Sequence, residues 1–437
     1  MKHALWLMLW VIVSASAQET TQHLPLQGEG GDGGELARGR TLPHMDSLDF
    51  SGALRFDYFS SSRTLDDRKD FPGGTLQAKV QPAWNDALRG KLEGRITQPK
   101  LGSGTADSTL LESWLALRTE ASEWRLGKQI VPWGRADGIN PTDNLTPRDF
   151  SVLLPFEEDQ RLGLTALKLD YYLTEAHTLT FFTTPEFSPS KLPRPVDGTQ
   201  IAETRPGSSL SDSTVALKIN KTGDDLDWSA SYFRGYSHLP EATLIGTSGG
   251  FPILQWHYDK IEVWGADFAK NFGRWGARGE LAYYATQDKN GNDPAIKNPF
   301  LFYVLGADRT FFDNLNVNLQ LIGRRVRNYH DPAAISDPLA RSVAMQNAIT
   351  DGQQDRESYG ISTRISNKWW NDTLEAEVLM LGYITRPSYF LRPLVSYAFD
   401  DHIKGSLGGE IYGGADDTFY GQLKRNRNIF VELRYSF

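Results

Sequence analysis

The chain of 437 residues contains no cysteine. This absence excludes disulfide scaffolds, thiolate nucleophiles, iron–sulfur clusters and zinc sites built on cysteine. The sequence also lacks a basic tract, and a formal net charge of −8 argues against a nucleic-acid partner. Beyond the N-terminus there is no run of about 18 apolar residues, which excludes membrane-spanning helices. What the sequence has in quantity is aromatic residues (12 Trp, 17 Tyr, 22 Phe) and 40 Gly.

The N-terminus has the pattern of a secretory signal. Lys2 and His3 are basic, residues 4–13 are apolar, and Ala15-Ser16-Ala17 supplies the small residues of a cleavage site. The apolar run is too short to span a bilayer. We therefore expect residues 1–17 to be a cleaved signal peptide.

The next segment, residues 18–46, is polar and rich in glycine. We expect it to form a flexible N-terminal tail on the periplasmic side. It contains the spacing G-x-G-x-x-G at Gly28, Gly30 and Gly33. Because no strand precedes these glycines and no βαβ unit follows them, they do not indicate a dinucleotide site.

From residue 47 onward the hydrophobic pattern has a period of two. At the C-terminus, alternate residues from Ile429 to Phe437 are apolar, and Glu432, Arg434 and Ser436 lie between them. Apolar residues on one face and charged residues on the other are typical of a half-buried strand. Eighteen segments show this pattern, and they begin near Leu48, Thr75, Ala87, Ser108, Glu123, Arg161, His177, Ser213, Leu226, Leu254, Arg274, Pro299, Asn314, Arg356, Thr373, Tyr389, His402 and Asn428.

The connections between these segments alternate between short and long. Short ones such as Asn85-Asp86 and Asp400-Asp401 consist of turn residues, whereas residues 130–160 and 329–355 are much longer. This alternation predicts an all-β fold: a transmembrane antiparallel up-and-down β-barrel of about 18 strands over residues 47–437, with short periplasmic turns and long extracellular loops. A soluble propeller would require a repeat of about 40–50 residues, which is absent. A soluble sandwich would not need such dense charge on its polar faces.

Two segments resemble known families. The ending Leu433-Arg434-Tyr435-Ser436-Phe437 is similar to the terminal strand of bacterial outer-membrane barrels, in which the assembly machinery reads the final aromatic. That resemblance implies an assembly signal at Tyr435 and Phe437. The segments Leu126-Gly127-Lys128-Gln129, Trp133-Gly134 and Gly138-Ile139-Asn140-Pro141 resemble a poorly characterised porin-like family of proteobacterial outer-membrane proteins, within a broad group that includes the alginate-export type. This second resemblance implies the barrel fold and an outer-membrane location in a Gram-negative bacterium, but no functional residues.

A barrel of eighteen strands encloses an aqueous space unless loops fill it. The alternation places charges of both signs on the inner face, with a slight basic excess that predicts a weak anion preference. The alternative is that many of these charges form ion pairs that stiffen the wall. The residues expected to line the lumen are Arg89, Lys91, Glu93, Arg95, Arg324, Arg364, Glu375 and Glu377.

The connection formed by residues 130–160 is too long and too apolar for a solvated loop. We expect it to fold into the lumen and to form a pore constriction with Arg135, Asp137, Arg148 and Asp149. The alternative is a cap on the rim of the barrel. Residues 329–355 are polar and are expected to form a mobile surface loop. Trp and Tyr near strand ends, such as Trp275 and Tyr283, are expected in aromatic girdles, with a carbohydrate-stacking path as the alternative.

The predicted function is a passive outer-membrane channel for small hydrophilic solutes, narrowed by residues 130–160. The runner-up is an export or assembly conduit for a polysaccharide or lipid-linked product that works with periplasmic partners. A hydrolase on the barrel rim is the third hypothesis, although no H-E-x-x-H, G-x-S-x-G or P-loop motif occurs, so we expect no enzyme. No cofactor or metal is implied. The expected partners are outer-membrane lipid, the barrel-assembly machinery and the solutes, and a homo-oligomer is left open.

Overall fold

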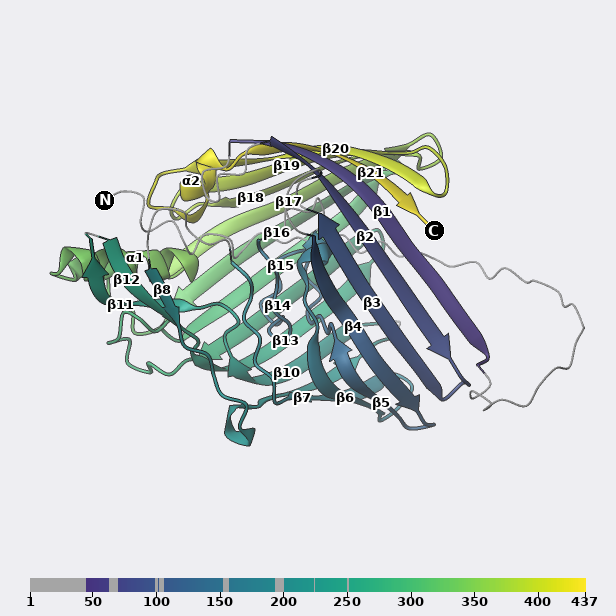
Figure 1. Ribbon diagram of the computed structural model, residues 1–437, viewed down its shortest axis with the longest axis horizontal. Coiled ribbons are helices and arrows are strands. Elements are labelled where there is room, and N and C mark those ends of the chain that lie inside the picture. The colour runs from purple at the N-terminus through teal and green to yellow at the C-terminus, as the bar shows by residue number, and fades with distance from the viewer. Residues whose placement is uncertain are drawn as a thin grey trace, which may run out of the picture.

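A computed structural model describes residues 45–437 apart from 63–69, 99–100, 102–105, 152–156, 193–199, 224 and 250. The expected signal peptide and all but the last two residues of the expected tail lie outside the described residues. Within them, the predicted barrel is confirmed (Figure 1).

Eighteen antiparallel strands form one closed sheet, in which each strand pairs with the next along the chain and β21 pairs with β1. The strands are β1 (Ser47–Ser61), β2 (Asp70–Ala83), β3 (Leu88–Gln98), β4 (Asp107–Arg118), β5 (Ser122–Gln129), β6 (Leu164–Tyr172), β7 (His177–Thr184), β9 (Thr214–Lys221), β10 (Asp227–Tyr236), β13 (Lys260–Phe272), β14 (Trp275–Ala285), β15 (Phe300–Phe311), β16 (Leu315–Val326), β17 (Glu357–Trp369), β18 (Leu374–Tyr383), β19 (Ser388–Ala398), β20 (Ile403–Gly414) and β21 (Asn428–Ser436). The turn between β13 and β14 is two residues, 273–274, whereas the connection from β16 to β17 on the other side is 327–356. Short turns and long loops therefore occupy opposite ends, as predicted.

The barrel has an apolar outer face and a polar inner face. On β16, Leu319 and Leu321 are 48% and 53% exposed, whereas Asn318 and Gln320 beside them are 5% and 2% exposed. This reverses the pattern of a soluble protein, because the exposed side chains are the apolar ones. An outer surface of this kind suits lipid, and the inward row suits a polar lumen.

Aromatic side chains mark the two ends of this apolar band. On β14, Trp275 lies next to the short turn, and Tyr283 lies eight residues further toward the long loops. The Trp275 ring contacts Phe311, and the Tyr283 ring lies 6.1 Å from Trp264. Eight residues of strand tilted by about 40° span roughly 20 Å along the barrel axis, close to the apolar height of about 25 Å in such barrels.

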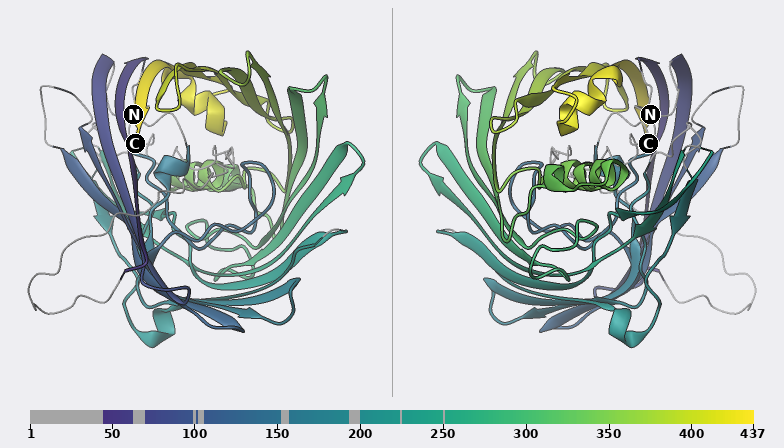
Figure 2. Two further views of the ribbon diagram at one scale, coloured as in Figure 1. Left: turned by 90° about the vertical axis from the view of Figure 1, so that its right-hand side faces the viewer. Right: turned by 90° about the vertical axis from the view of Figure 1, so that its left-hand side faces the viewer.

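Two parts of the long-loop end differ from the sequence-based expectation. The segment expected as one strand from Leu254 is two strands: β12 (Phe251–His257) belongs to a separate small sheet with β8 (Gln200–Glu203) and β11 (Glu241–Ser248), and β13 begins at Lys260. The segment 329–355, expected to be a polar and mobile surface loop, contains helix α1 (Pro338–Thr350), and several side chains of its second half are buried. Figure 2 shows α1 across the opening of the barrel rather than outside it. The remaining short helices are η2 (Glu157–Gln160), η3 (Leu210–Asp212), η4 (Pro332–Ala334), α2 (Phe419–Gln422) and η5 (Leu423–Arg425).

The two ends of the barrel sequence meet at the seam between β1 and β21. Beyond the last strand, Phe437 continues the ladder, because Gly52 N donates to Phe437 O at 2.8 Å and Phe437 N donates to Gly52 O at 3.0 Å. The Phe437 ring lies 5.5 Å from Phe50 and covers Gly52, where a Cβ would come within 2.6 Å of the ring. The terminal aromatic therefore belongs to the barrel wall.

In the part of the chain that the structure describes, no helix is both long enough and apolar enough to cross a membrane.

Candidate functional site

The candidate site is the lumen and the segment that crosses it. Residues 130–163, here called the inner loop, leave β5 and return to β6. Their described residues contact β13, β14, β16 and β17 on the inner wall. In the closed order of strands β17 is nine places from β5, so the inner loop reaches the opposite wall of an eighteen-stranded barrel. Figure 2, viewed along the barrel, shows this segment inside the ring of strands.

The main anchor of the inner loop is Glu280 on β14, whose side chain is buried. Its Oε1 accepts hydrogen bonds from Arg135 N at 2.5 Å, Ala136 N at 2.6 Å and Asn140 Nδ2 at 2.9 Å. Its Oε2 accepts from Thr142 Oγ1 at 3.0 Å and Thr142 N at 3.3 Å. One carboxylate thus holds five donors of the loop, and hydrogen bonds to a charged acceptor are stronger than neutral ones.

This anchor explains the residues that carried the family resemblance. Gly134 has φ of +101°, and a Cβ there would lie 2.5 Å from Glu280 Oε1 and 2.7 Å from Asn140 Nδ2. Glycine is the residue that adopts this backbone and leaves room for the carboxylate. Asn140 also donates to Ala136 O at 2.8 Å, which closes the turn that presents the backbone N–H groups. The motif at 133–141 therefore builds the loop and docks it.

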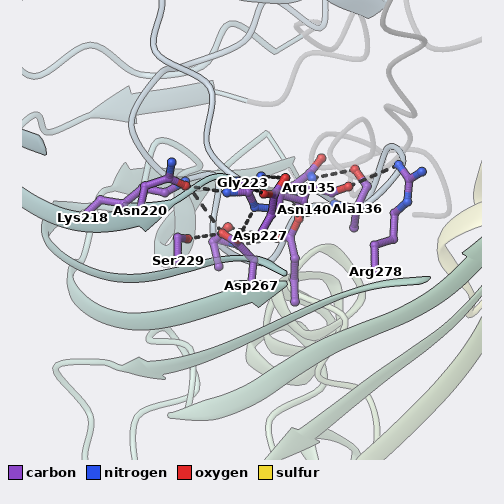
Figure 3. Close-up of polar contacts among 12 residues, drawn as sticks. Arg135, Ala136, Asn140, Lys218, Asn220, Gly223, Asp227, Ser229, Asp267 and Arg278 are labelled. Atoms are coloured by element: carbon purple, nitrogen blue, oxygen red, sulfur yellow. Dashed lines mark hydrogen bonds and ion pairs between the residues drawn. The ribbon is translucent and has the colours of Figure 1, made fainter. Parts of the chain in front are cut away.

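Arg135, one of the predicted constriction residues, projects toward one side of the lumen (Figure 3). Its Nη2 donates to Asn220 Oδ1 at 2.5 Å on β9, and its Nε donates to Asp267 Oδ1 at 2.7 Å on β13. Asp227 on β10 lies 3.5 Å from Nη1. Ser229 also donates to the Asp267 carboxylate, and Lys218 lies 3.7 Å from it. Arg135 is thus held among two carboxylates and an amide of three neighbouring strands.

Asp137, the second predicted constriction residue, contacts a different part of the wall. Its carboxylate lies 3.1 Å from Arg364 Nε on β17, and its backbone carbonyl accepts from Gln320 Nε2 at 2.6 Å on β16. Burial raises the pKa of the Asp137 carboxyl, and the positive charges of Arg364 and Arg278 oppose that rise. Arg135 and Asp137, two residues apart, therefore tie the inner loop to two separate parts of the wall, β9–β13 and β16–β17.

The other two predicted residues lie elsewhere. Arg148 is 3.4 Å from Asp143 within the inner loop, and Asp143 also binds Arg161 at 2.8 Å. Asp149 is 1% exposed, and its carboxylate pairs with Lys191 at 3.1 Å and accepts from Ser151. The structure thus places Arg135 and Asp137 against the inner wall of the barrel, and Arg148 and Asp149 in other contacts nearer the long-loop end.

The inner loop also contacts the wall near the seam. Arg55 on β1 pairs with Asp159, and Arg95 on β3 donates to the Asp159 carbonyl at 2.5 Å. Both arginines are almost fully buried. The loop is consequently fixed at its outward and its returning limb. Arg95 is among the residues predicted to line the lumen, but nothing in the local pattern indicates that one residue of the inner loop joins it to Arg55.

Most of the residues predicted to line the lumen take part in ion pairs. Arg89 binds Glu123 at 2.6 Å, and Lys91 binds Glu93 at 2.7 Å and also pairs with Glu112. Arg364 lies 3.3 Å from Glu377, while Glu375 stands opposite Lys368 in the register of β17 and β18. Arg324 is different, because it donates to the carbonyl of Asp351 and lies over the rings of Phe300 and Phe302 at 5.0 and 4.5 Å. Wall-to-wall pairing is therefore extensive.

At the long-loop end, α1 and the small sheet lie above the inner loop. Asn347 on α1 exchanges hydrogen bonds with the backbone of Ala242 on β11, at 3.1 and 2.9 Å. Lys297 is buried between Glu241 at 3.2 Å and Asp351 at 2.9 Å. Burial raises the pKa of Glu241 well above its ordinary value, although the charge of Lys297 opposes this effect. This ion cluster joins three separate loops over the lumen.

Two cavities flank this cluster. One, of about 220 Å³, lies between the inner loop and the wall and is lined by Arg148, His238, Tyr284, Phe302 and Arg324 among others. The other, of about 290 Å³, lies beside α1 and is lined by Asp293, His330 and Asn347 among others. Lys297 and Asp351 line both cavities. Among the described residues, no group of three or more His, Asp or Glu side chains is arranged to hold a metal ion.

Solved structures similar to this chain are outer-membrane barrels. OpdK from Pseudomonas aeruginosa aligns with a TM-score of 0.56 at 10% identity, over 90% of this chain and 99% of OpdK. OccAB1 from Acinetobacter baumannii gives 0.55 at 10% identity, over 91% and 98% of the two chains. OccD3 (OpdP) from Pseudomonas aeruginosa gives 0.54 at 11% identity, over 90% and 92%. At these identities the likeness establishes the barrel fold alone.

Sequence comparison gives a family match over most of the chain. No curated protein matches the chain. Residues 43–437 match the family described as protein of unknown function (DUF1302), which covers the whole barrel and the inner loop. The chain therefore belongs to the DUF1302 family.

Proposed function

We propose that this protein is an outer-membrane channel through which small hydrophilic solutes diffuse, and that the inner loop sets the width of the passage. The observation that supports this proposal most directly is the inner loop itself, which crosses the lumen from β5 to β17 and is anchored by Glu280. A loop that served only as a rim cap would not need a buried carboxylate on the far wall. The polar inner wall provides the aqueous path that a hydrophilic solute requires.

Within this proposal, Arg135 and Asp137 form the narrowest part. They carry opposite charges, and each is held by partners on a different part of the wall. Arg148 lines the cavity of about 220 Å³ on the long-loop side, and Asp149 ties the inner loop to Lys191 in the connection between β7 and β9. Because their wall partners neutralise most of the lumen charges, we expect the anion preference of the channel to be weak.

The test is single-channel conductance of the refolded mature protein in a planar bilayer, with the reversal potential measured in a salt gradient. Steady ohmic conductance with a small reversal potential of anion-selective sign supports the proposal. A cation-selective reversal potential contradicts the expected lumen charge, while leaving the channel itself intact. Absence of conductance at all voltages contradicts an open channel.

The second candidate is a gated conduit for export of a polymer or lipid-linked product. The observation that favours it is α1, which lies across the barrel opening and is joined to the neighbouring loops by Asn347 and the Lys297 cluster. Under this hypothesis the wild-type protein conducts little, and deletion of residues 338–350 restores a large conductance. A rim hydrolase, the third hypothesis, would instead show lipid cleavage that one serine or histidine substitution abolishes.

A further inference from the structure

The outer face of the barrel carries three arginines at one point of its long-loop end. Arg325 is at the end of β16, Arg327 follows it, and Arg356 directly precedes β17. We call these three residues the arginine rim. They line a shallow hollow of about 490 Å³, whose other lining residues include Tyr283 and Leu301. All three are exposed, and the Arg325 side chain is 69% exposed.

The alternation of β16 shows that this hollow faces lipid rather than the lumen. Arg325 continues the row of the lipid-facing Leu319 and Leu321, whereas Arg324 belongs to the inner row. Between Leu321 and Arg325 the same row contains Gly323, which is covered by the ring of Tyr303. Arg327 lies next to the outward Tyr283, with 6.0 Å from its guanidinium to the ring centroid and 3.5 Å from Nη1 to the hydroxyl.

The arginine rim is poorly compensated by acidic groups. Arg325 lies 3.5 Å from Glu357, but that carboxylate also accepts a hydrogen bond from Tyr359 at 2.6 Å. Within the described part of the chain, neither Arg327 nor Arg356 has a carboxylate within 4.0 Å. On the inner wall, by contrast, Arg89 and Arg364 both have acidic partners. Adjacent like charges repel one another, so a bound anion would stabilise this site.

The position of the arginine rim along the barrel axis indicates which kind of anion it would bind. Four residues of tilted strand separate Leu321 from Arg325, which is roughly 10 Å along the barrel axis. The guanidinium groups thus lie just beyond the apolar band, where phosphates of the outer leaflet meet a barrel wall. Leu321 and Leu305, about half exposed, continue below as a surface for acyl chains.

We propose that the arginine rim binds the phosphorylated headgroup of an outer-leaflet glycolipid of the lipid A type. Its phosphate accepts charge-assisted hydrogen bonds from the guanidinium groups, and its acyl chains lie along the leucines of β15 and β16. This inference rests on the membrane placement in the proposed function, but not on conduction. Conductance and lipid binding can therefore fail independently.

The experiment measures binding of bisphosphorylated lipid A to the detergent-purified mature protein by native mass spectrometry. We expect one lipid A per chain, and at least tenfold weaker binding by R325Q/R327Q/R356Q. Dephosphorylated lipid A should bind the wild type at least tenfold more weakly than lipid A. Should the triple variant fail to fold, as judged by heat-modifiable migration, R327Q alone should weaken binding about threefold.

The matched control is R118Q/R274Q/K368Q, which removes three exposed cations from the short-turn end. We expect it to bind lipid A like the wild type. Equal loss in both triple variants would show that total charge, rather than this site, attracts the lipid, and would overturn the proposal. Equal affinity of the wild type for inorganic pyrophosphate and lipid A would also overturn it, because the leucines would then contribute nothing.

Discussion

Replacement of Glu280 by glutamine should release the inner loop from the far wall. The amide keeps one oxygen for the three donors at Oε1, but presents an NH₂ group to Thr142, whose hydroxyl turns to accept from it while the Thr142 backbone N–H loses its acceptor. A hydrogen bond to a charged acceptor contributes about 1.5–3 kcal/mol, so loss of this one costs the docked loop about 1.5–3 kcal/mol. At about 1.4 kcal/mol per factor of ten, the undocked population rises by roughly 10–10²-fold.

The assay is single-channel recording in planar bilayers. With a released loop, we expect Glu280→Gln to show a larger mean conductance and more frequent current steps than the wild type. Leu281→Ala is the matched control, because Leu281 is the next residue on β14 but faces lipid and is 45% exposed. Identical conductance and noise in the wild type and Glu280→Gln would refute the reasoning that this carboxylate holds the loop in the passage.

Three further predictions concern other parts of the barrel. Gly134→Ala should destabilise the docked loop by about 1–3 kcal/mol, because alanine is strained at φ of +101° and its Cβ would meet Glu280; loop proteolysis in detergent should accelerate, and an unchanged cleavage rate would contradict this. The pKa of Glu241 is raised above the usual 4.5, so this carboxyl group holds its proton more tightly in the folded protein than in the unfolded chain. Its contribution to the stability of the cluster of loops around α1 is therefore complete below pH 4.5 and is lost as the pH rises through the raised pKa. Hydrogen-exchange protection of α1 should therefore fall as the pH rises in the wild type but stay level in Glu241→Gln. The same dependence of protection on pH in both proteins would refute the role of Glu241. Phe437→Ala should reduce the yield of folded barrel in membranes because the seam loses its ring contact with Phe50, whereas the lipid-facing Phe399→Ala should not.

The barrel could be predicted because its physical rule is local. Alternation along Ile429–Phe437 indicates which side chains face lipid, and turn residues such as Asn371-Asp372 indicate where a strand ends. The small sheet was missed because β12 alternates like a barrel strand and lies only two residues before β13. Helix α1 was not predicted because its apolar residues do not form a clear stripe along one face, although a start signal is present: Asp337 accepts from Ala340 N at 2.6 Å, and Pro338 follows it.

The site was less predictable, because its contacts join residues that are far apart in the sequence. The length and apolar content of residues 130–160 indicated an inward segment, and the contacts of Arg135 and Asp137 lie inside the barrel. Glu280 could not be selected from the sequence, because it is one of many inward carboxylates and its partners are about 140 residues away. The sequence pattern of the inner loop also could not distinguish Asp149, whose side chain is buried, from Asp137, which contacts the inner wall.

The seam between β1 and β21 has a consequence for biogenesis. The first and last strands of the sheet are hydrogen-bonded neighbours, so the cylinder cannot close until β21 has been delivered. The inner loop meets the same seam, since its carboxylate Asp159 pairs with Arg55 on the first strand. Closure of the wall and docking of the inner loop therefore share one strand: a chain truncated before residue 428 leaves β1 without its β21 partner, and the strand that carries Arg55 becomes an open edge.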